Sequence, residues 1–256
     1  MIWAFGSDEK VRTVGIIGCG AIGTIIAKAV EQRIVECDKL ILYDHNLEKA
    51  EKLKRSIHFP IKAVSSLDEM IKLKPAVIIE AASQQAVKEY AEKILAEKID
   101  LILMSVGALL DLKLKSSRVH VPSGAIGGLD AISSARLAGI EEVVLISRKN
   151  PRALDMDNEE EKIVYEGSAE GAVRRFPREM NVAATLALTV DPSKVKVQVV
   201  SDPKVHRNVH EIEVRWKHGD MLLRFSNDPH PENPRTSALA AWSAIKLLKE
   251  ILERHA

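Results

Sequence analysis

The chain has 256 residues, of which 46% are hydrophobic and 29% charged, a composition that fits a globular protein and excludes disordered, collagen-like and membrane-embedded chains. Its 37 basic and 36 acidic side chains leave a formal net charge of +1, so we expect no binding to nucleic acid or to a membrane surface. The two cysteines, Cys19 and Cys37, lack the spacing of a disulfide framework or a metal site, and the short apolar start is no signal peptide, so we expect a cytoplasmic protein.

The first half of the chain alternates between short apolar runs and amphipathic stretches. Residues 11–17 predict a strand, the turn Gly18-Cys19-Gly20-Ala21-Ile22-Gly23 follows, and helical spacing resumes over residues 22–30. Further strands are expected at residues 40–43, 63–64, 76–80 and 100–106, and further helices at residues 47–57, 67–73 and 84–97. Uninterrupted apolar strands separated by helices are typical of a parallel sheet that helices cover on both faces.

After Gly107 the pattern changes to strands in which inward and outward residues alternate. We expect such strands at residues 143–147, 163–165, 195–200, 210–216 and 221–225, with a hairpin turn at His218-Gly219-Asp220, and helices at residues 129–138 and 181–188. Asn233-Pro234-Arg235-Thr236-Ser237 predicts the start of a last helix, whose apolar stripe comprises Leu239, Trp242, Ile245, Leu248 and Leu252. This half predicts an antiparallel sheet with helices on one face, and a last helix that packs back on the first half.

The glycine-rich turn after the first strand has the pattern of a dinucleotide-binding site. Such a pattern is weak alone, but here it follows a strand, opens a helix and is joined by Asp44 at the end of the second strand. Gly18 permits the tight turn, Gly20 lets the backbone approach a pyrophosphate, and Gly23 lets helix and strand pack closely. Asp44 would bind the ribose hydroxyls and repel a 2′-phosphate, which favours NAD over NADP, although His45 and Asn46 could soften that preference. The predicted cofactor residues of this part are Gly18, Gly20, Ala21, Ile22, Gly23 and Asp44.

Two further strand ends should line the same crevice, because ligands in open parallel sheets lie beyond the carboxyl ends of the strands. Ala82 and Ser83 follow one strand and Ser105 lies near the end of the next, so we expect all three to contact the cofactor. The alternative for Ser83 and Ser105 is a structural role in helix capping or turn formation.

Together these elements predict an α/β protein with a Rossmann-type doubly wound parallel sheet and a second α+β domain built on a mainly antiparallel sheet. We expect a dinucleotide-binding domain over residues 1–122, completed by a C-terminal helix over residues 235–256. Residues 123–234 would form the catalytic, substrate-binding and dimerisation domain. Since a sheet with helices on one face leaves the other face open, we expect a homodimer through that face.

Several stretches far apart in the chain resemble the L-aspartate dehydrogenases, in the order found in that family. The matching stretches are Glu80-Ala81-Ala82-Ser83-Gln84, Ser123-Gly124-Ala125-Ile126-Gly127-Gly128-Leu129-Asp130-Ala131, Phe176-Pro177 followed by Asn181-Val182-Ala183-Ala184-Thr185, and Asn233-Pro234-Arg235-Thr236-Ser237. The resemblance covers nearly the whole chain and is more specific than the glycine pattern. Two departures are a shorter segment between Gly107 and Gly124 and an extension of about ten residues ahead of the family's usual start.

The resemblance implies NAD(P)-dependent oxidative deamination of L-aspartate to iminoaspartate, which hydrolyses to oxaloacetate and ammonia and can feed NAD biosynthesis. It also implies that Ala125 and Asn181 contact the nicotinamide and that His210 is the catalytic histidine. The pattern around His210 fits this role: in a strand it shares the apolar, inward face with Ile212 and Val214. The alternative is a hydrogen-bonded core histidine. His206 is separated from His210 by the alternation of the strand, so we expect no metal site.

A histidine with an ordinary pKa near ~6.5 can exchange protons near neutral pH, so His210 is the candidate acid or base. A dicarboxylate also needs cations, and Arg148 and Lys149 are preferred because they close a strand of the second domain, over Arg174, Arg175 and Arg207. Two alternatives stay open. One is a related two-domain enzyme of the homoserine dehydrogenase or dihydrodipicolinate reductase type, and the other is a non-catalytic dinucleotide sensor.

Overall fold

The first sheet of the protein is parallel throughout. The computed structural model describes residues 12–112, 114, 116–230 and 233–254. The strand order is β3-β2-β1-β4-β5-β6. The strands are β1 (Thr13–Ile17), β2 (Lys39–Tyr43), β3 (Ile61–Val64), β4 (Val77–Glu80), β5 (Asp100–Leu103) and β6 (Val119–His120). The predicted sheet is confirmed. Val11, where we expected the first strand to begin, and the ten-residue extension lie outside the described residues.

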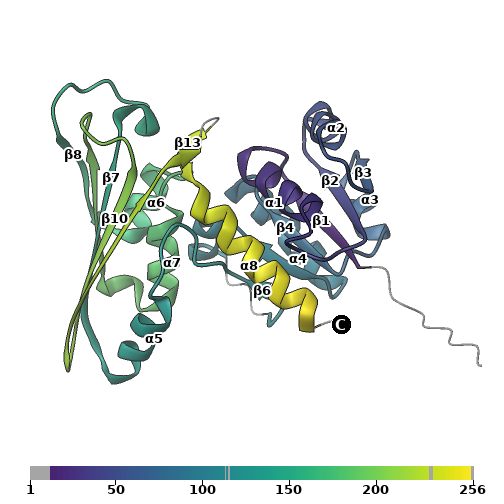
Figure 1. The fold of residues 1–256 in the computed structure, drawn as a ribbon. Coiled ribbons are helices and arrows are strands. Elements are labelled where there is room, and N and C mark those ends of the chain that lie inside the picture. Colours follow the sequence, from purple (N-terminus) through teal and green to yellow (C-terminus); the bar gives the residue numbers. More distant parts are fainter. Residues whose placement is uncertain (1–11, 113, 115, 231–232, 255–256) are drawn as a thin grey trace, which may run out of the picture.

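Helices cover both faces of this sheet, as predicted (Figure 1). They are α1 (Ala21–Glu31), α2 (Leu47–Ser56), α3 (Leu67–Lys72), α4 (Gln84–Ala96) and α8 (Ala238–Arg254). Leu40 and Leu42 join a core cluster with α1, α2 and α8, whereas Ile41 between them joins a second cluster with α3 and α4. Both faces of the strands are buried, which is why the sequence reads as continuous apolar runs.

The switch point of the sheet lies at β1, because the chain proceeds from β1 outward to β2 on one side and then to β4 on the other. Ligands of doubly wound sheets bind beyond the carboxyl ends of the strands at this point. β5 is shorter than expected: it ends at Leu103, and the 3₁₀ helix η1 (Val106–Leu110) follows, so the prediction of a strand to residue 106 is wrong at its end.

The last helix returns to the first sheet, as predicted, and lies beside α1 in Figure 1. Its start was predicted wrongly. Asn233–Ser237 form the strand β13, which pairs antiparallel with β12 (Pro229–His230), and α8 begins only at Ala238. The predicted stripe is also displaced, because Leu239 and Trp242 are exposed. The buried side chains of α8 are Ala241, Ala244, Ile245, Leu248, Ile251 and Leu252.

The second sheet has the order β11-β10-β7-β9-β8. Its strands are β7 (Ile140–Lys149), β8 (Lys162–Ser168), β9 (Val195–Ser201), β10 (Asn208–Trp216) and β11 (Gly219–Asn227). β7 and β9 pair in parallel, whereas the other pairings are antiparallel, so the sheet is mixed. The predicted hairpin joins β10 to β11, with Gly219 already paired to Trp216.

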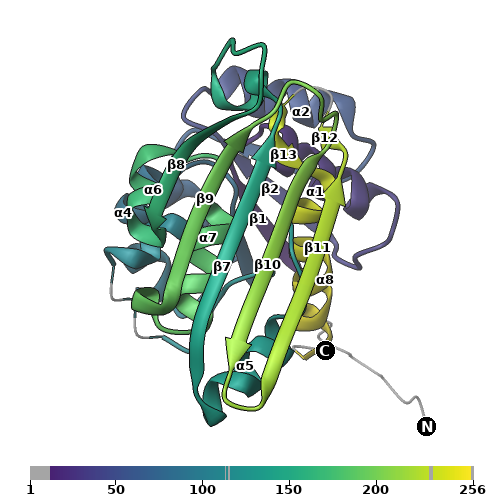
Figure 2. The ribbon, with the colours of Figure 1, turned by 90° about the vertical axis from the view of Figure 1, so that its left-hand side faces the viewer.

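Three α-helices cover one face of this sheet: α5 (Leu129–Ala138), α6 (Ala169–Arg175) and α7 (Asn181–Thr189). Figure 2 looks onto the opposite face, which no helix of the described residues covers. α6 is a helix that the sequence analysis did not predict. The division of the chain at residues 122 and 234 stays a prediction. None of the described helices has the length and apolar character needed to span a membrane.

Candidate functional site

A cleft of about 760 Å³ lies between the two sheets, beyond the carboxyl ends of the parallel strands. One wall comes from the glycine turn and the ends of β2, β4 and β5, and the other comes from β7, β10 and the start of α7. Most of the residues predicted for the site line this cleft: Gly18, Gly20, Ala21, Ile22, Asp44, Ala82, Ser83, Ser105, Ala125, Lys149, Asn181 and His210.

The three glycines of the first turn meet different surroundings. Gly18 has φ +96°, and a Cβ there would lie 2.6 Å from the carbonyl oxygen of Ala81. A Cβ on Gly23 would collide with the backbone of Gly18. A Cβ on Gly20 would meet nothing within 4 Å, so this position opens into the cleft at the start of α1. The free amides at a helix start suit an anion such as a pyrophosphate, and the open space at Gly20 fits one.

Asp44 lies at the end of β2 and joins that strand to the glycine turn. Its Oδ2 accepts a hydrogen bond from the amide of Cys19 at 2.8 Å, and its Oδ1 accepts one from the amide of Asn46 at 2.9 Å. The ring of His45 lies 3.1 Å from Oδ1. The carboxylate is largely buried yet lines the cleft, where it can accept from a diol and would repel a phosphate.

Glu80, at the end of β4, is a residue whose role the sequence analysis missed. It is 1% exposed, and its Oε1 accepts from the amides of Ala82 and Ser83, each at 2.8 Å. Ser105 donates its amide to Oε2 at 3.0 Å and its hydroxyl to Oε1 at 2.9 Å. Burial raises the pKa of Glu80, and these hydrogen bonds oppose the rise. Glu80 therefore fixes the two loops that form the floor of the cleft.

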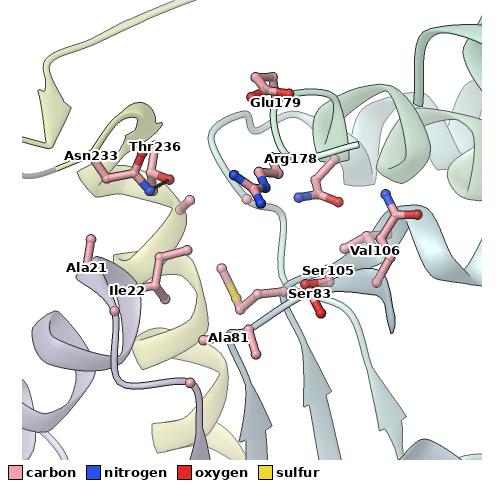
Figure 3. A pocket seen from close by; sticks show the side chains of 18 of the residues that line it. Ala21, Ile22, Ala81, Ser83, Ser105, Val106, Arg178, Glu179, Asn233 and Thr236 are labelled. Atoms are coloured by element: carbon pink, nitrogen blue, oxygen red, sulfur yellow. Dashed lines mark hydrogen bonds between the residues drawn. The ribbon is translucent and has the colours of Figure 1, made fainter. Parts of the chain in front are cut away.

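The hydroxyls of Ser83 and Ser105 both have structural partners. Ser83 Oγ accepts from the amide of Ala86 at 3.1 Å and caps α4, while Ser105 Oγ donates to Glu80. This matches the structural alternative for the two serines. Both residues nevertheless line the cleft, and Figure 3 shows them side by side at its floor.

Replacing Glu80 with alanine is expected to lower the free energy of unfolding by about 2 kcal/mol, because the buried amide and hydroxyl of Ser105 would lose their acceptor. Glu80→Gln keeps an acceptor oxygen and should cost less. Urea denaturation of the two variants measures both effects. An alanine variant as stable as the original chain would contradict this role.

Hydrogen bonds between segments far apart in the sequence hold the opposite wall. Asn181, the first residue of α7, accepts at Oδ1 from the amide of Gly107 at 3.1 Å. Asn227 donates to the carbonyl oxygen of Ala125 at 3.1 Å, and the amide of Gly124 donates to Ser243 at 3.0 Å. The second glycine turn and the start of α7 are therefore tied to elements distant in sequence.

His210 lies on the inner face of β10, and its position there confirms the predicted alternation, since Ile212 and Val214 are buried on the same face. The imidazole is 2% exposed, and its Nδ1 lies 3.1 Å from Ser147 Oγ on β7. Burial, with the charge of Lys149 as the smaller cause, lowers the pKa of His210 to about 3. The ring is therefore neutral near pH 7, and one of its two nitrogens carries a lone pair.

Lys149 is the second buried ionisable group on this wall. Burial lowers the pKa of its ammonium group to about 8, and the nearby Glu179 opposes that fall. Arg148 points to the other face of β7, where its guanidinium contacts Glu161 at 2.8 Å and Asp202 at 2.9 Å. The structure brings Lys149 to the cleft but not Arg148.

Arg178, Asn233 and Thr236 line the cleft, and the sequence analysis did not select their side chains. Figure 3 shows Arg178 on the loop before α7, across the cavity from Asn233 and Thr236. Asn233 Nδ2 donates to Thr236 Oγ1 at 3.1 Å. The sequence did carry a signal for these three residues. Arg178 lies between Phe176-Pro177 and Asn181, which belong to the stretches that carry the family resemblance. Asn233 and Thr236 belong to the motif that was interpreted as a helix start. No cluster of three metal-ligating side chains occurs among the described residues.

Comparison with known proteins gives matches over both halves of the chain. A family model described as "Aspartate dehydrogenase, C-terminal" matches residues 130–251, and one described as "Homoserine dehydrogenase, NAD binding domain" matches residues 18–119. The L-aspartate dehydrogenase of Methanothermobacter thermautotrophicus is 42% identical over 252 residues, with 94% of this chain and 96% of the relative covered. That of Archaeoglobus fulgidus is 42% identical over 250 residues, with 94% and 98% covered. The crystal structure of aspartate dehydrogenase from Thermotoga maritima matches with a TM-score of 0.73 at 30% identity, covering 94% of this chain and 96% of that one.

Proposed function

The chain belongs to the L-aspartate dehydrogenase family, and we propose that it catalyses the NAD-dependent oxidative deamination of L-aspartate to iminoaspartate, which water converts to oxaloacetate and ammonia. One observation supports this most strongly. A single cleft has a dinucleotide turn on one wall and a neutral histidine beside a buried lysine on the other.

The residues of the first wall, together with Ala125 and Asn181 of the opposite wall, suit the cofactor. The open side of Gly20 and the amides at the start of α1 would hold the pyrophosphate, Asp44 the adenosine ribose, and Ala125 and Asn181 the nicotinamide side. The carboxylate of Asp44 favours NAD, while NADP stays an alternative that the assay below distinguishes. A nicotinamide held there would supply the acceptor for the hydride from the Cα of the substrate.

His210 handles the proton in this proposal. Aspartate arrives as an ammonium ion, and its nitrogen must lose a proton before its lone pair can form the C=N bond. The neutral imidazole accepts that proton at the ring nitrogen that faces the cleft, while the Cα hydrogen leaves with its electron pair as hydride. The protein thus supplies the base and the orientation of the reacting carbon.

Lys149 and Arg178 supply the cations for the two carboxylates. Lys149 is buried near His210, whereas Arg178 reaches the cleft from the loop before α7. A buried ammonium holds a carboxylate strongly because little water competes with it. The sequence analysis preferred Arg148 as much as Lys149 for binding a substrate carboxylate. Arg148 is left out of the proposal because its side chain lies on the other face of β7.

The lowered pKa of Lys149 predicts a pH dependence. Lys149 is protonated below pH about 8 and loses its charge above it, so kcat/KM for aspartate should fall above pH 8 by up to ~10-fold per pH unit. Steady-state rates between pH 6.5 and 10 measure this fall. Lys149→Met is the control: its kcat/KM should be low at pH 7.5 and lack the fall. The same fall in the methionine variant would contradict the role of Lys149.

An initial-rate assay separates the alternatives. L-aspartate should reduce NAD, and reduce NADP more slowly, whereas L-homoserine should give no turnover. Homoserine oxidation, or reduction of a cyclic imine without aspartate turnover, would favour the related two-domain enzymes. Tight NAD binding without turnover of any amino acid would favour a sensor.

The proposal also covers two further properties, the oligomeric state and the metabolic role. We propose a homodimer through the face of the second sheet seen in Figure 2, since that face lacks a helix layer within the described residues. Sedimentation at low concentration tests it. The second is that the iminoaspartate formed feeds NAD biosynthesis, as the resemblance to the L-aspartate dehydrogenases implies.

A further inference from the structure

We propose that Ser147 is a positioning residue, which holds the imidazole of His210 so that Nδ1 carries the proton and Nε2 presents its lone pair to the cleft. This inference rests on the proposed function of His210 as the proton acceptor. It gives Ser147 a role in the reaction although its side chain does not touch the substrate.

The two residues face each other across neighbouring strands. His210 of β10 is paired directly with Ser147 of β7, and both side chains are on the inner face of the sheet. Ser147 is 0% exposed and does not line the cleft, whereas His210 does. Since Nδ1 lies 3.1 Å from Ser147 Oγ, the other ring nitrogen is the one left for the cleft.

The other flank of His210 offers no competing partner. Its register partner on β11 is Phe225, whose side chain is hydrocarbon. Within the described parts of the chain, no carboxylate is hydrogen-bonded to the ring. The hydroxyl of Ser147 can donate to Nδ1 or accept from Nδ1–H, and only the second arrangement leaves Nε2 with a lone pair for the cleft.

A hydroxyl partner acts on the ring differently from a carboxylate partner. When Nδ1–H donates to Ser147 Oγ, Nε2 is free to accept the substrate's proton, and the same hydrogen bond persists in the imidazolium. No group has to reorient during the transfer. A carboxylate at this place would favour the charged imidazole, whereas a neutral hydroxyl leaves His210 unprotonated before the reaction, which agrees with the lowered pKa of the ring.

Ser147→Ala tests the inference, because it removes one oxygen from a buried site and adds no volume. We expect kcat for aspartate to fall about 10-fold or more, with KM and the Kd for NAD changed less than about twofold. Ser147→Thr keeps the hydroxyl and should restore kcat to within about threefold. Ser201→Ala is the matched control: it removes an equally buried hydroxyl of the same sheet, one bonded to Asn158, and should leave kcat unchanged.

Nitrogen NMR of the ¹⁵N-histidine-labelled protein gives a readout that a general loss of packing would not reproduce. The signals of His210 are identified by their absence in His210→Asn. We expect the Nδ1–H form in the original chain and in Ser147→Thr, and a shift to the Nε2–H form in Ser147→Ala.

An unchanged kcat and an unchanged ring proton in Ser147→Ala, with His210→Ala inactive, would overturn this inference alone. Turnover that survives His210→Ala would overturn the proposed role of His210 and this inference with it.

Discussion

Replacing His210 with alanine is expected to lower kcat for aspartate oxidation by about 10²- to 10⁴-fold, the usual contribution of a positioned acid or base. The Kd for NAD should change less than about threefold, because His210 lies on the wall opposite the glycine turn. The physical reason is the surroundings of the ring: it is buried, neutral and lines the cleft, whereas His45, which also lines the cleft, lies beside Asp44 on the other wall.

Stopped-flow or steady-state rates give kcat, and calorimetric titration gives the Kd for NAD. His210→Asn serves as a second variant, since the amide fills much of the same volume and can still contact Ser147. Turnover within a few-fold of the original in either variant would show that another group accepts the proton.

Replacing Gly20 with glutamate is expected to raise the Kd for NAD on the order of 100-fold, which corresponds to about 2.7 kcal/mol. The φ of Gly20 is −86°, and a Cβ there meets nothing within 4 Å, so the backbone accepts a side chain without strain. The added carboxylate would occupy the open space at the start of α1 and repel the pyrophosphate.

Two further variants make this result specific. Gly20→Ala adds a single methyl group and should weaken binding less. Leu137→Glu places the same charge on α5 at a side chain that is 91% exposed, and should leave the Kd unchanged. Thermal unfolding checks that all three variants fold. A Kd for Gly20→Glu within threefold of the original would mean that the pyrophosphate binds elsewhere.

The first sheet and its helices could be predicted from the sequence because each element carries its own periodic signal. The errors arise where strand pairing, and not local composition, decides the structure. Asn233–Ser237 have the composition of a helix start, yet they pair with β12 and form a strand. The parallel pairing of β7 with β9 likewise depends on a long connection that local patterns do not encode. α6 is short and contains Gly171, so its helical signal is weak.

The residues of the candidate site also differ in whether the local sequence predicts them. The glycine turn is a contiguous motif and Asp44 directly follows an apolar strand, so the sequence carries a local signal for both. Lys149 could not be separated from Arg148, because the predicted strand stopped at residue 147. With β7 extended to Lys149, alternation places Lys149 with Ser147 on the inner face and Arg148 on the outer one.

Other parts of the site had no local signal. The contact between Ser147 and His210 follows from the register of two strands 63 residues apart. The four hydrogen bonds of Glu80 come mostly from backbone amides, which no side-chain pattern reveals.

Isotope transfer from L-aspartate deuterated at Cα tests the central proposal most directly. With NAD and this substrate, we predict that the NADH formed carries the deuterium and that one ammonia is released for each NADH. NADH without deuterium, or no NADH formed while NAD binds normally, would contradict the assignment of this cleft to aspartate oxidation.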